Sequence, residues 1–372
     1  MDADDDRTGS ILYCRCCWMV FGSYKHSGES TFRTPLLHVY ECECVFGVLE
    51  VNVWKSIGCL VQSKEKVMSK VSIISVNYNQ PEVTLELLES LRKQDYQDLE
   101  IIVVDNDSKL DPTRLIHDQY PEVKVIRSDQ NLGFAGGNNL GIKEASGDFL
   151  FFLNNDTEVP NGTIKALVDA FSLNPKTGVV CPIINYFDQP GLTQYAGYTA
   201  INSLTGRNQA IGYKQQVQPK LRISETHYAH GAAMMVRREV VDQVGLMPEN
   251  YFLYYEELDW GAQIKKAGYK IQVVQSVFIL HKESVSTGKA SPLKTYFQTR
   301  NRLLFMRRNM SLTQKVMFYC FFLCVALPKN VLQFVFRREI DHLKSYWNGA
   351  IWNFTNDINS NRIGYIYESL RS

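Results

Sequence analysis

Three short polar clusters are the parts of this sequence whose residue types best suit chemistry. The clusters Asn77–Asn79, Asp105–Asp107 and Asn154–Asp156 each directly follow a run of apolar residues. Side chains this compact can hydrogen-bond a base and a ribose, and their oxygens can hold a hard cation. Asn and Asp are also common turn residues, so any one cluster alone is more simply explained as a turn. Three clusters after three apolar runs favour a binding site.

The apolar runs before these clusters predict the buried strands of a parallel sheet. They are short and rich in β-branched or aromatic residues, and a helical pattern of Val83, Leu87, Leu88 and Leu91 follows the first run. Strands that alternate with helices indicate an α/β, doubly wound fold. In such sheets the ligand binds at the carboxyl ends of the strands, where the clusters lie. The predicted strands are Val71–Val76, Leu99–Val104, Val123–Ile126 and Phe149–Leu153.

The chain after the third cluster predicts a less regular second half. One helix there opens on three carboxylates, Glu256, Glu257 and Asp259, which in a first helical turn often interact only with the helix dipole. Arg237 and Arg238, after a strand entered through small residues, suit phosphate contacts or plain surface solvation. The expected segments are a helix over 163–173, irregular chain over 185–222, a strand over 230–236, a helix over 256–268 and a strand ending at 281.

Seven segments, taken in order, resemble the family 2 glycosyltransferases of GT-A fold. They are VSIISVNYN, VVDNDS, NLGFAGGNN, FLFFLNNDTEV, HGAAMMVRREV, YFLYYEELDW and AGYKI with the histidine at 281. The similarity runs over residues 71–309 and is nearest to bacterial rhamnosyltransferase-like enzymes of cell-surface polysaccharide synthesis. It implies a GT-A type, mostly parallel sheet with helices on both faces in a catalytic domain over 68–290. A helical segment over 291–372 would follow it.

The resemblance implies that the first two clusters bind a nucleotide-diphospho-sugar donor. Asn77, Tyr78 and Asn79 would line the nucleoside pocket, because they follow the first strand. Asp105 would accept a hydrogen bond from the base.

The glycine-rich stretch 131–139 is expected to form a loop that enters a short helix. Its glycines lack the G-x-G-x-x-G spacing and do not follow the first strand, so a dinucleotide-binding oxidoreductase is a poor interpretation. By resemblance, backbone groups of Asn131 and Gly136 would contact the sugar-nucleotide.

The third cluster, Asn154, Asn155 and Asp156, occupies the family's D-x-D position, where a carboxylate holds Mg²⁺ or Mn²⁺ against the donor diphosphate. The cation stabilises the negative charge that develops on the departing nucleoside diphosphate. Asn154 replaces the first Asp, although an amide carbonyl still offers an oxygen ligand. His281 matches a position that can add a nitrogen ligand. The alternative for His281 is a strand-end histidine satisfied by ordinary hydrogen bonds.

By resemblance, Glu257 falls at the position of the general base. An inverting transfer needs a carboxylate on the face of the sugar opposite the leaving group, where it takes the proton of the acceptor hydroxyl. Glu256 and Asp259 are close enough in sequence to compete for this role, and Glu is one methylene longer than the Asp common there. Gln263 stands where relatives often have Arg.

Composition limits both the partners and the domain boundary. The 372 residues include 40 Lys+Arg against 39 Asp+Glu and contain no basic run, which argues against nucleic acid as a partner. Six cysteines lie within the first 59 residues, and five of them form a C-x-C-C and a C-x-C, which lack the usual zinc-ligand spacing. The acidic start MDADDD disfavours a secretory signal and hence disulfides. We expect residues 1–67 to be a cysteine-rich extension, either disordered or non-native through a start codon assigned too far upstream.

The C-terminal segment combines a basic patch with an apolar run. Arg302, Arg307 and Arg308 precede Val316–Leu327, which is shorter than the roughly 20 residues that cross a bilayer. This pattern is typical of a helix lying in a membrane interface, and a helical hairpin folded on the domain explains it equally well. A membrane surface would suit a polyprenyl-linked acceptor, and an oligosaccharide is the other acceptor class.

The sequence therefore predicts an inverting glycosyltransferase that transfers rhamnose or another hexose. It is expected to be cytoplasmic and peripheral at the inner face of the plasma membrane. The alternative is a non-catalytic sugar-nucleotide-binding subunit, which would have no need of the acids at 156, 257 and 259. A nucleotidyltransferase would require a glycine-rich, basic loop after the first strand, and NYNQPE is neither.

Overall fold

The structure is a computed structural model that describes residues 13–14, 17–18, 69–282 and 291–365. The chain divides into two compact units, Met1–Val67 and Met68–Ser372. In the first unit, strand β1 (Tyr13–Cys14) pairs antiparallel with β2 (Cys17–Trp18). The rest of the predicted extension over residues 1–67 lies outside the described residues. The zinc and disulfide alternatives for its cysteines lie outside them as well.

The first half of the second unit forms the predicted parallel sheet. Its elements are β3 (Val71–Asn77), α1 (Pro81–Arg92), β4 (Leu99–Asn106), α2 (Thr113–His117), β5 (Lys124–Ser128), α3 (Gly133–Glu144) and β6 (Phe149–Leu153). The strands pair in parallel in the order β5-β4-β3-β6. Every residue of β6 is buried, as expected for a strand covered on both faces. The carboxyl ends of β3, β4 and β6 therefore share one edge of the sheet, with a polar cluster after each.

Helix α3 is the predicted short helix, but it starts earlier, within the stretch predicted as a glycine-rich loop. It begins at Gly133 and lies directly against β3, because its glycines leave no side chain between helix and sheet. A Cβ at Gly141 would lie 2.4 Å from Cγ2 of Ile74. A Cβ at Gly136 would lie 2.6 Å from that of Leu132. The loop was predicted because glycine weakens a helix by about 1 kcal/mol relative to Ala, a cost that close packing offsets here.

The second half of this unit extends the sheet with mixed pairing. Its elements are β7 (Thr157–Glu158), α4 (Thr163–Ser172), β8 (Thr177–Tyr186), β9 (Thr193–Tyr195), β10 (Ile223–Glu225), β11 (Ala233–Arg237), α5 (Arg238–Val244), the 3-10 turn Glu249–Tyr251, α6 (Glu256–Lys266) and β12 (Lys270–His281). The order continues from β6 as β11-β8-β12-β10. Strand β11 runs antiparallel to β6 and β8, whereas β8 and β12 are parallel. The antiparallel strand brings the start of β11 to the end of β6, beside the third polar cluster.

Two arginines predicted to contact phosphate or solvent serve the fold instead. Arg237 Nε donates to the Thr177 carbonyl at 2.8 Å, and its Nη2 donates to the Phe171 carbonyl at 2.7 Å. Arg238 donates in the same way to the carbonyls of residues 145 and 147. Both guanidinium groups thus satisfy backbone oxygens where helices end.

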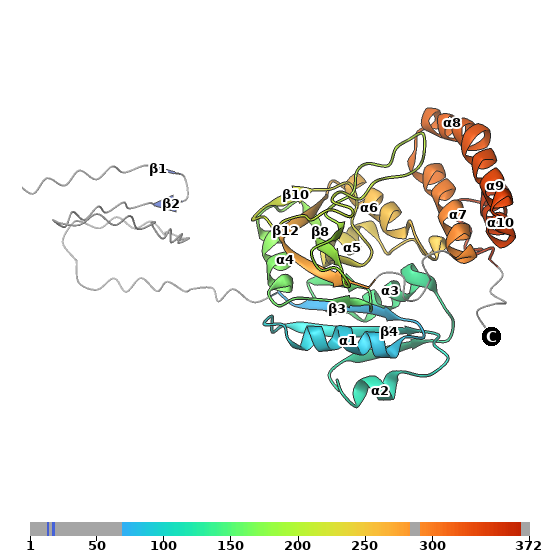
Figure 1. The fold of residues 1–372 in the computed structure, drawn as a ribbon. Coiled ribbons are helices and arrows are strands. Elements are labelled where there is room, and N and C mark those ends of the chain that lie inside the picture. The colour runs from blue at the N-terminus through green and yellow to red at the C-terminus, as the bar shows by residue number, and fades with distance from the viewer. Residues whose placement is uncertain (1–12, 15–16, 19–68, 283–290, 366–372) are drawn as a thin grey trace, which may run out of the picture. The chain divides into compact units, whose positions relative to one another are not determined.

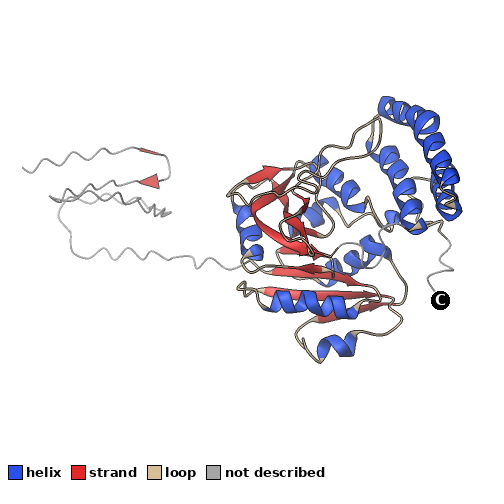
Figure 2. Cartoon of the chain, in the orientation of Figure 1, coloured by secondary structure: helices blue, strands red, loops and turns tan. Residues whose placement is uncertain are grey.

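The C-terminal segment is helical and packs at one end of the unit (Figures 1 and 2). Its elements are α7 (Pro292–Asn309), α8 (Leu312–Phe321), the π-helical turn η2 (Phe322–Ala326), α9 (Leu327–Phe336) and α10 (Ile340–Thr355). The run from Leu312 to Phe336 is the one helix among the described residues with the length and composition to cross a membrane, at mean hydropathy 1.6. The run predicted from the sequence, Val316–Leu327, stopped before Pro328 and was therefore too short. In the structure the π-helical turn η2 precedes Pro328, and such a turn lets a helix continue past a proline, whose ring and missing N–H disturb α-helical hydrogen bonding.

Candidate active site

Four buried polar side chains at the ends of β3 and β4 and in the first turn of α1, here called the strand-end network, hydrogen-bond to one another. They are Asn77, Thr84, Asp105 and Ser108. Asn77 Nδ2 donates to Asp105 Oδ1 at 2.8 Å, and Asn77 Oδ1 accepts from Thr84 Oγ1 at 3.0 Å. Asp105 Oδ2 accepts from the Ser108 amide at 3.3 Å. The Asp105 side chain is fully buried and its oxygens accept hydrogen bonds within the protein, so its predicted hydrogen bond to a base stays a prediction.

The residues around this network are more accessible. Tyr78 is half-buried and Asn79 is exposed, with a left-handed φ of 55°. The backbone N–H of Asn79 donates to Ser108 Oγ at 2.8 Å, which joins the loop after β3 to the loop after β4. Asn131 Oδ1 accepts from Asn106 Nδ2 at 3.1 Å and so links the start of α3 to β4. Of the first predicted cluster, Tyr78 and Asn79 are therefore the side chains that face solvent.

The third cluster meets the end of β12 in an unusual contact. Asp156 Oδ1 lies 3.2 Å from His281 Nε2, and the two side chains are 9% and 8% exposed. The geometry makes no hydrogen bond, since Oδ1 is a buried atom without a partner. Asn154 Nδ2 lies 3.4 Å from the same His281 nitrogen. Asn155 turns away and donates to Thr84 Oγ1 at 3.1 Å, which connects this cluster to the strand-end network.

Gln194 fixes the orientation of the His281 ring. Its Oε1 lies 2.8 Å from His281 Nδ1, while its Nε2 donates to the His281 carbonyl at 3.4 Å. An amide oxygen only accepts, so Nδ1 is the donor, and in the neutral imidazole Nε2 is then the acceptor that lies beside Asp156 Oδ1 and Asn154 Nδ2. Two acceptors facing each other suit a divalent cation bound by oxygen and nitrogen. Among the described residues no three His, Cys, Asp or Glu side chains gather around a metal position, and Asp156 and His281 form a pair.

Glu256 and Glu257 open α6 as carboxylates removed from water. Glu256 is buried and Glu257 half-buried, and Oε2 of each has no hydrogen-bond partner. Burial raises the pKa of Glu257 to about 7. Burial and the adjacent Glu257 charge raise the pKa of Glu256 well above its usual value. A carboxyl group that titrates near 7 is matched to proton transfer at neutral pH.

A strained segment, residues 251–255, delivers these carboxylates. Phe252, Tyr254 and Tyr255 have φ angles of 66°, 68° and 74°, a left-handed conformation that costs bulky residues about 1–3 kcal/mol each. Asn301 of α7 holds the segment, since its Nδ2 donates to three of its carbonyls at 2.9, 2.7 and 2.8 Å. The YFQTRN stretch of α7 therefore positions the start of α6.

His230 and Tyr198 lie between the Asp156–His281 pair and Glu257, and neither was predicted from the sequence. The His230 ring packs edge-on against His281, with centroids 6.2 Å apart, and stacks on Tyr198 at 5.8 Å. The Glu257 charge, after burial, raises the pKa of Tyr198. The HGAAMM motif contains His230, but only the antiparallel placement of β11 brings it here. Tyr198 lies in irregular chain that carries no readable pattern. We call Asp156, His281, Glu256 and Glu257 the carboxylate centre.

Asp259, the third predicted catalytic acid, anchors α6 on α7. It is 1% exposed and accepts from Arg308 Nε at 3.2 Å and from Gln263 Nε2 at 2.9 Å. Asn309 Nδ2 donates to its other oxygen. Both oxygens of Asp259 thus have donors, whereas Glu256 and Glu257 each keep an unpaired one.

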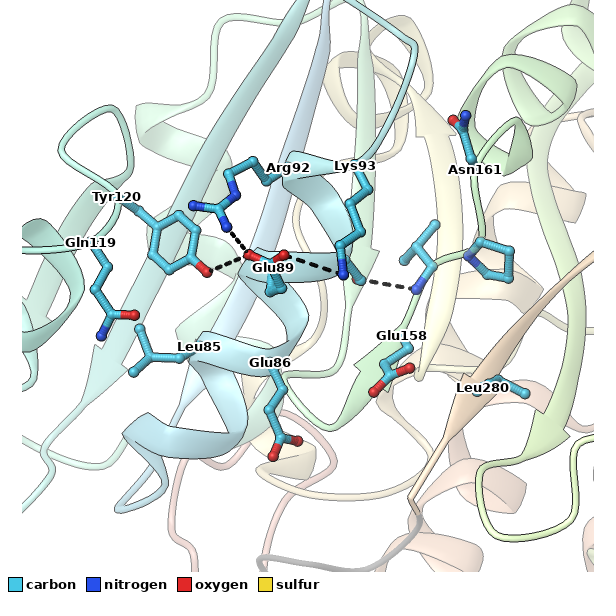
Figure 3. Close-up of a pocket in the computed structure, with 13 residues that line it drawn as sticks. Leu85, Glu86, Glu89, Arg92, Lys93, Gln119, Tyr120, Glu158, Asn161 and Leu280 are labelled. Atoms are coloured by element: carbon cyan, nitrogen blue, oxygen red, sulfur yellow. Dashed lines mark hydrogen bonds and ion pairs between the residues drawn. The ribbon is translucent and has the colours of Figure 1, made fainter.

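A separate pocket of about 750 Å³ lies over α1 and β7 (Figure 3). Its central carboxylate, Glu89, lies 3.2 Å from Tyr120 Oη and from Lys93 Nζ and also pairs with Arg92. None of the predicted site residues is among those that line it. With its central charge paired, this pocket lacks the unpaired acceptors of the carboxylate centre.

Residues 72–245 match the model of glycosyl transferase family 2. The chain carries a family 2 glycosyltransferase domain. Of two similar curated proteins, the N-acetylglucosaminyl-diphospho-decaprenol L-rhamnosyltransferase of Mycobacterium tuberculosis is 27% identical over 239 residues, 58% of this chain and 77% of that protein. The low-salt glycan biosynthesis hexosyltransferase Agl10 of Haloferax volcanii is 26% identical over 306 residues, 80% of this chain and 94% of that protein.

The fold of this glycosyltransferase is also found in solved structures. The crystal structure of GalNAc-T7 with UDP, GalNAc and Mn²⁺ matches with a TM-score of 0.53 at 18% identity, over 65% of this chain and 48% of that chain. Similarity at this identity speaks for the fold alone. The predicted family and the predicted GT-A fold are confirmed.

Proposed function

We propose that this glycosyltransferase is an inverting, divalent-cation-dependent enzyme that moves a hexose from a nucleoside-diphospho-sugar to a lipid-linked acceptor in cell-surface glycan synthesis. Two relatives support this class by name, one a rhamnosyltransferase for a diphospho-decaprenol-linked sugar and one a hexosyltransferase of glycan biosynthesis. Rhamnose is accordingly the first donor sugar to test, and an oligosaccharide is the second acceptor class. The accessible Tyr78 and Asn79 are proposed to meet the nucleoside.

The contact between Asp156 Oδ1 and His281 Nε2 carries the proposal. A buried carboxylate oxygen without a hydrogen bond, 3.2 Å from an oriented imidazole lone pair, favours a bound Mg²⁺ or Mn²⁺ with Asn154 beside it. When bound, such a cation stabilises the negative charge on the departing nucleoside diphosphate.

Glu257 is the proposed general base. The acceptor hydroxyl gives its proton to Glu257 as its oxygen attacks the anomeric carbon. The bond from that carbon to the donor phosphate breaks, and its electron pair leaves with the nucleoside diphosphate. Burial raises the pKa of both carboxyl groups, and the charge of Glu257 raises the pKa of Glu256 further, so the interaction favours a protonated Glu256 beside a charged Glu257.

Nucleoside diphosphate release by the purified full chain tests this function. UDP-, dTDP- and GDP-sugars are supplied with Mg²⁺ or Mn²⁺ and a lipid-diphosphate acceptor, beside Asp156→Ala and Glu257→Gln. We expect release that requires the cation with at least one donor and is lost in both variants. Saturable nucleotide binding without release would instead favour the non-catalytic, sugar-nucleotide-binding subunit.

The same proposal places the enzyme on the inner face of the plasma membrane through α8 and α9. Their 18-residue apolar window is 17% buried, and Leu332 and Phe336 are 68% and 90% exposed. The run 312–338 contains basic residues and no Asp or Glu, which suits anionic lipid. Flotation with phosphatidylglycerol vesicles tests this, and Leu332→Gln/Phe336→Gln is expected to remain at the bottom of the gradient. Flotation of that variant equal to wild type would contradict membrane contact by this face.

A further inference from the structure

A second pocket, lined by cationic side chains, lies where the hairpin 199–209 meets the C-terminal helices. It has a volume of about 830 Å³. Arg207 of the hairpin, Arg302 of α7 and Lys329 of α9 line it, and its lining contains no Asp or Glu. Three positive charges without an acidic partner in the wall give this pocket a positive potential.

Two buried donors in this pocket have no partner. Arg302 is 5% exposed, and its Nε makes no hydrogen bond. Its guanidinium lies 5.5 Å from the centre of the Phe322 ring, and burial lowers its pKa. Asn208 Nδ2, from the hairpin, is likewise buried and unpaired. Unpaired buried donors beside a guanidinium are satisfied by an anion with several acceptor oxygens.

The pocket adjoins the general base. Its hairpin starts directly after Tyr198, the phenol that faces the Glu257 charge. Tyr255 Oη donates to the Gly206 carbonyl at 3.1 Å and so ties the hairpin to the start of α6. The charges of Arg302, Arg207 and Glu257 all act on the Tyr255 phenol. Tyr255 therefore links the hairpin that lines the cationic pocket to the start of α6, which carries Glu257.

The other side of the pocket is apolar and continues onto the exposed helix face. Phe321 and Val325 line it, and Val325 is also 49% exposed. From there the exposed apolar residues of α9 continue through Leu332 to Phe336. The anion that fits this pocket is therefore one that carries an apolar chain.

We propose that this pocket binds the diphosphate of the lipid-linked acceptor, with Arg207, Arg302 and Lys329 on the phosphates and the lipid chain along α8 and α9. This placement rests on the proposed function, because it sets the acceptor sugar between the pocket and Glu257. It assigns acceptor recognition to residues outside the carboxylate centre.

Calorimetric titration of the full chain with farnesyl diphosphate, and separately with inorganic pyrophosphate, tests the pocket without turnover. The test variant is Arg207→Gln/Lys329→Gln, in which both residues are exposed and Arg302 keeps its packing. The control is Lys143→Gln/Lys176→Gln, which removes the same charge from exposed positions outside the pocket and outside the C-terminal helices. We expect farnesyl diphosphate to bind at least about tenfold tighter than pyrophosphate, since the apolar chain adds buried area. The test variant should lose at least about tenfold in affinity, and the control should bind like wild type.

This assignment would be overturned if pyrophosphate bound as tightly as farnesyl diphosphate, or if the test and control variants lost the same affinity for farnesyl diphosphate. It would also be overturned if phosphatidylglycerol vesicles displaced farnesyl diphosphate, because the pocket would then be a lipid headgroup site. In turnover, the test variant should raise KM for the lipid-diphosphate acceptor and leave KM for the donor unchanged. Failure of the proposed function would appear differently, as absent nucleoside diphosphate release with farnesyl diphosphate binding intact.

Discussion

The strand-end network and the carboxylate centre lie at the same edge of the sheet, but they differ in whether their buried polar atoms have hydrogen-bond partners. In the strand-end network, Asp105 has donors on both oxygens and Asn77 both donates and accepts. In the carboxylate centre, Asp156, Glu256 and Glu257 each have a buried oxygen without a hydrogen bond. Among the described residues these are all of the buried carboxylate oxygens in that condition.

This difference separates scaffold from site. An unpaired buried acceptor lowers the free energy of unfolding by about 1–3 kcal/mol. A folded protein is therefore expected to keep such an acceptor where a ligand or a proton can supply the missing partner. The strand-end network is complete without a ligand and holds the loops in place. The carboxylate centre is incomplete, which is why we assign cation binding and proton transfer to it.

The largest effect is expected for Glu257→Gln, which removes the proposed base and keeps its shape. The rate of nucleoside diphosphate release should fall about 10²- to 10⁴-fold. In wild type the rate should rise with pH through about 7, because the base acts when deprotonated and burial raises the pKa of Glu257 to that value. A Glu257→Gln enzyme with near-normal rates would move the base to another residue.

A smaller effect is expected for Gln194→Leu, which touches neither substrate. Without Gln194, the His281 ring loses the acceptor that fixes its Nδ1 proton. Mn²⁺ affinity should drop about 10- to 100-fold, measured by the electron paramagnetic resonance signal of free Mn²⁺. Gln194→Glu, which keeps an acceptor, is the matched control and should retain most of the affinity. Unchanged affinity in Gln194→Leu would show that His281 is not oriented for a metal.

A substitution in the strand-end network should lower the stability of the fold. Asp105→Asn keeps the shape but turns one acceptor into a donor that faces the donating amide of Asn77 or Ser108. We expect a loss of about 1–3 kcal/mol in the free energy of unfolding, measured by urea denaturation. Asp107→Asn, in the exposed part of the same turn, serves as control and should change stability little. Equal effects of the two substitutions would remove the distinction between scaffold and site.

The smallest expected effect is on the pH dependence of stability, through Glu256→Gln. A carboxyl whose pKa is raised in the folded state destabilises the fold as pH rises above its unfolded value of 4.5. Wild type should therefore lose stability between pH 5 and pH 8. Glu256→Gln should lose less, because Gln resembles the protonated form that the fold prefers. Urea midpoints at the two pH values measure this, and parallel declines would contradict the assignment.

The sequence predicted the parts of the fold that repeat a simple pattern. Phe149–Leu153 is a continuous apolar run, Val71–Asn77 is a mostly apolar and β-branched one, and His281 ends its strand as expected. It began the helix Gly133–Glu144 too late, because the intrinsic preference of glycine opposed the close packing that the tertiary structure provides. It also ended the apolar helix before Pro328, where a π turn lets the helix continue.

The candidate site was predictable to the level of residue type, and less so to the level of role. Asp156 and Glu257 keep the unpaired oxygens that their proposed roles need, and His281 Nε2 lies 3.2 Å from that of Asp156. Asp105 and Asp259 are equally acidic, yet each is saturated by hydrogen bonds that only the folded chain brings together. His230 and Gln194 could not be found in advance, because they reach His281 through strand pairings far apart in sequence.

The most direct test of this account compares two Asp→Asn substitutions in one Mn²⁺ titration. Free Mn²⁺ is followed by electron paramagnetic resonance with UDP or dTDP present, for wild type, Asp156→Asn and Asp105→Asn. The account predicts that Asp156→Asn weakens Mn²⁺ binding at least about tenfold while the folded Asp105→Asn protein binds it as wild type does. Equal binding by wild type and Asp156→Asn would contradict the claim that the unpaired carboxylate oxygen marks the cation site.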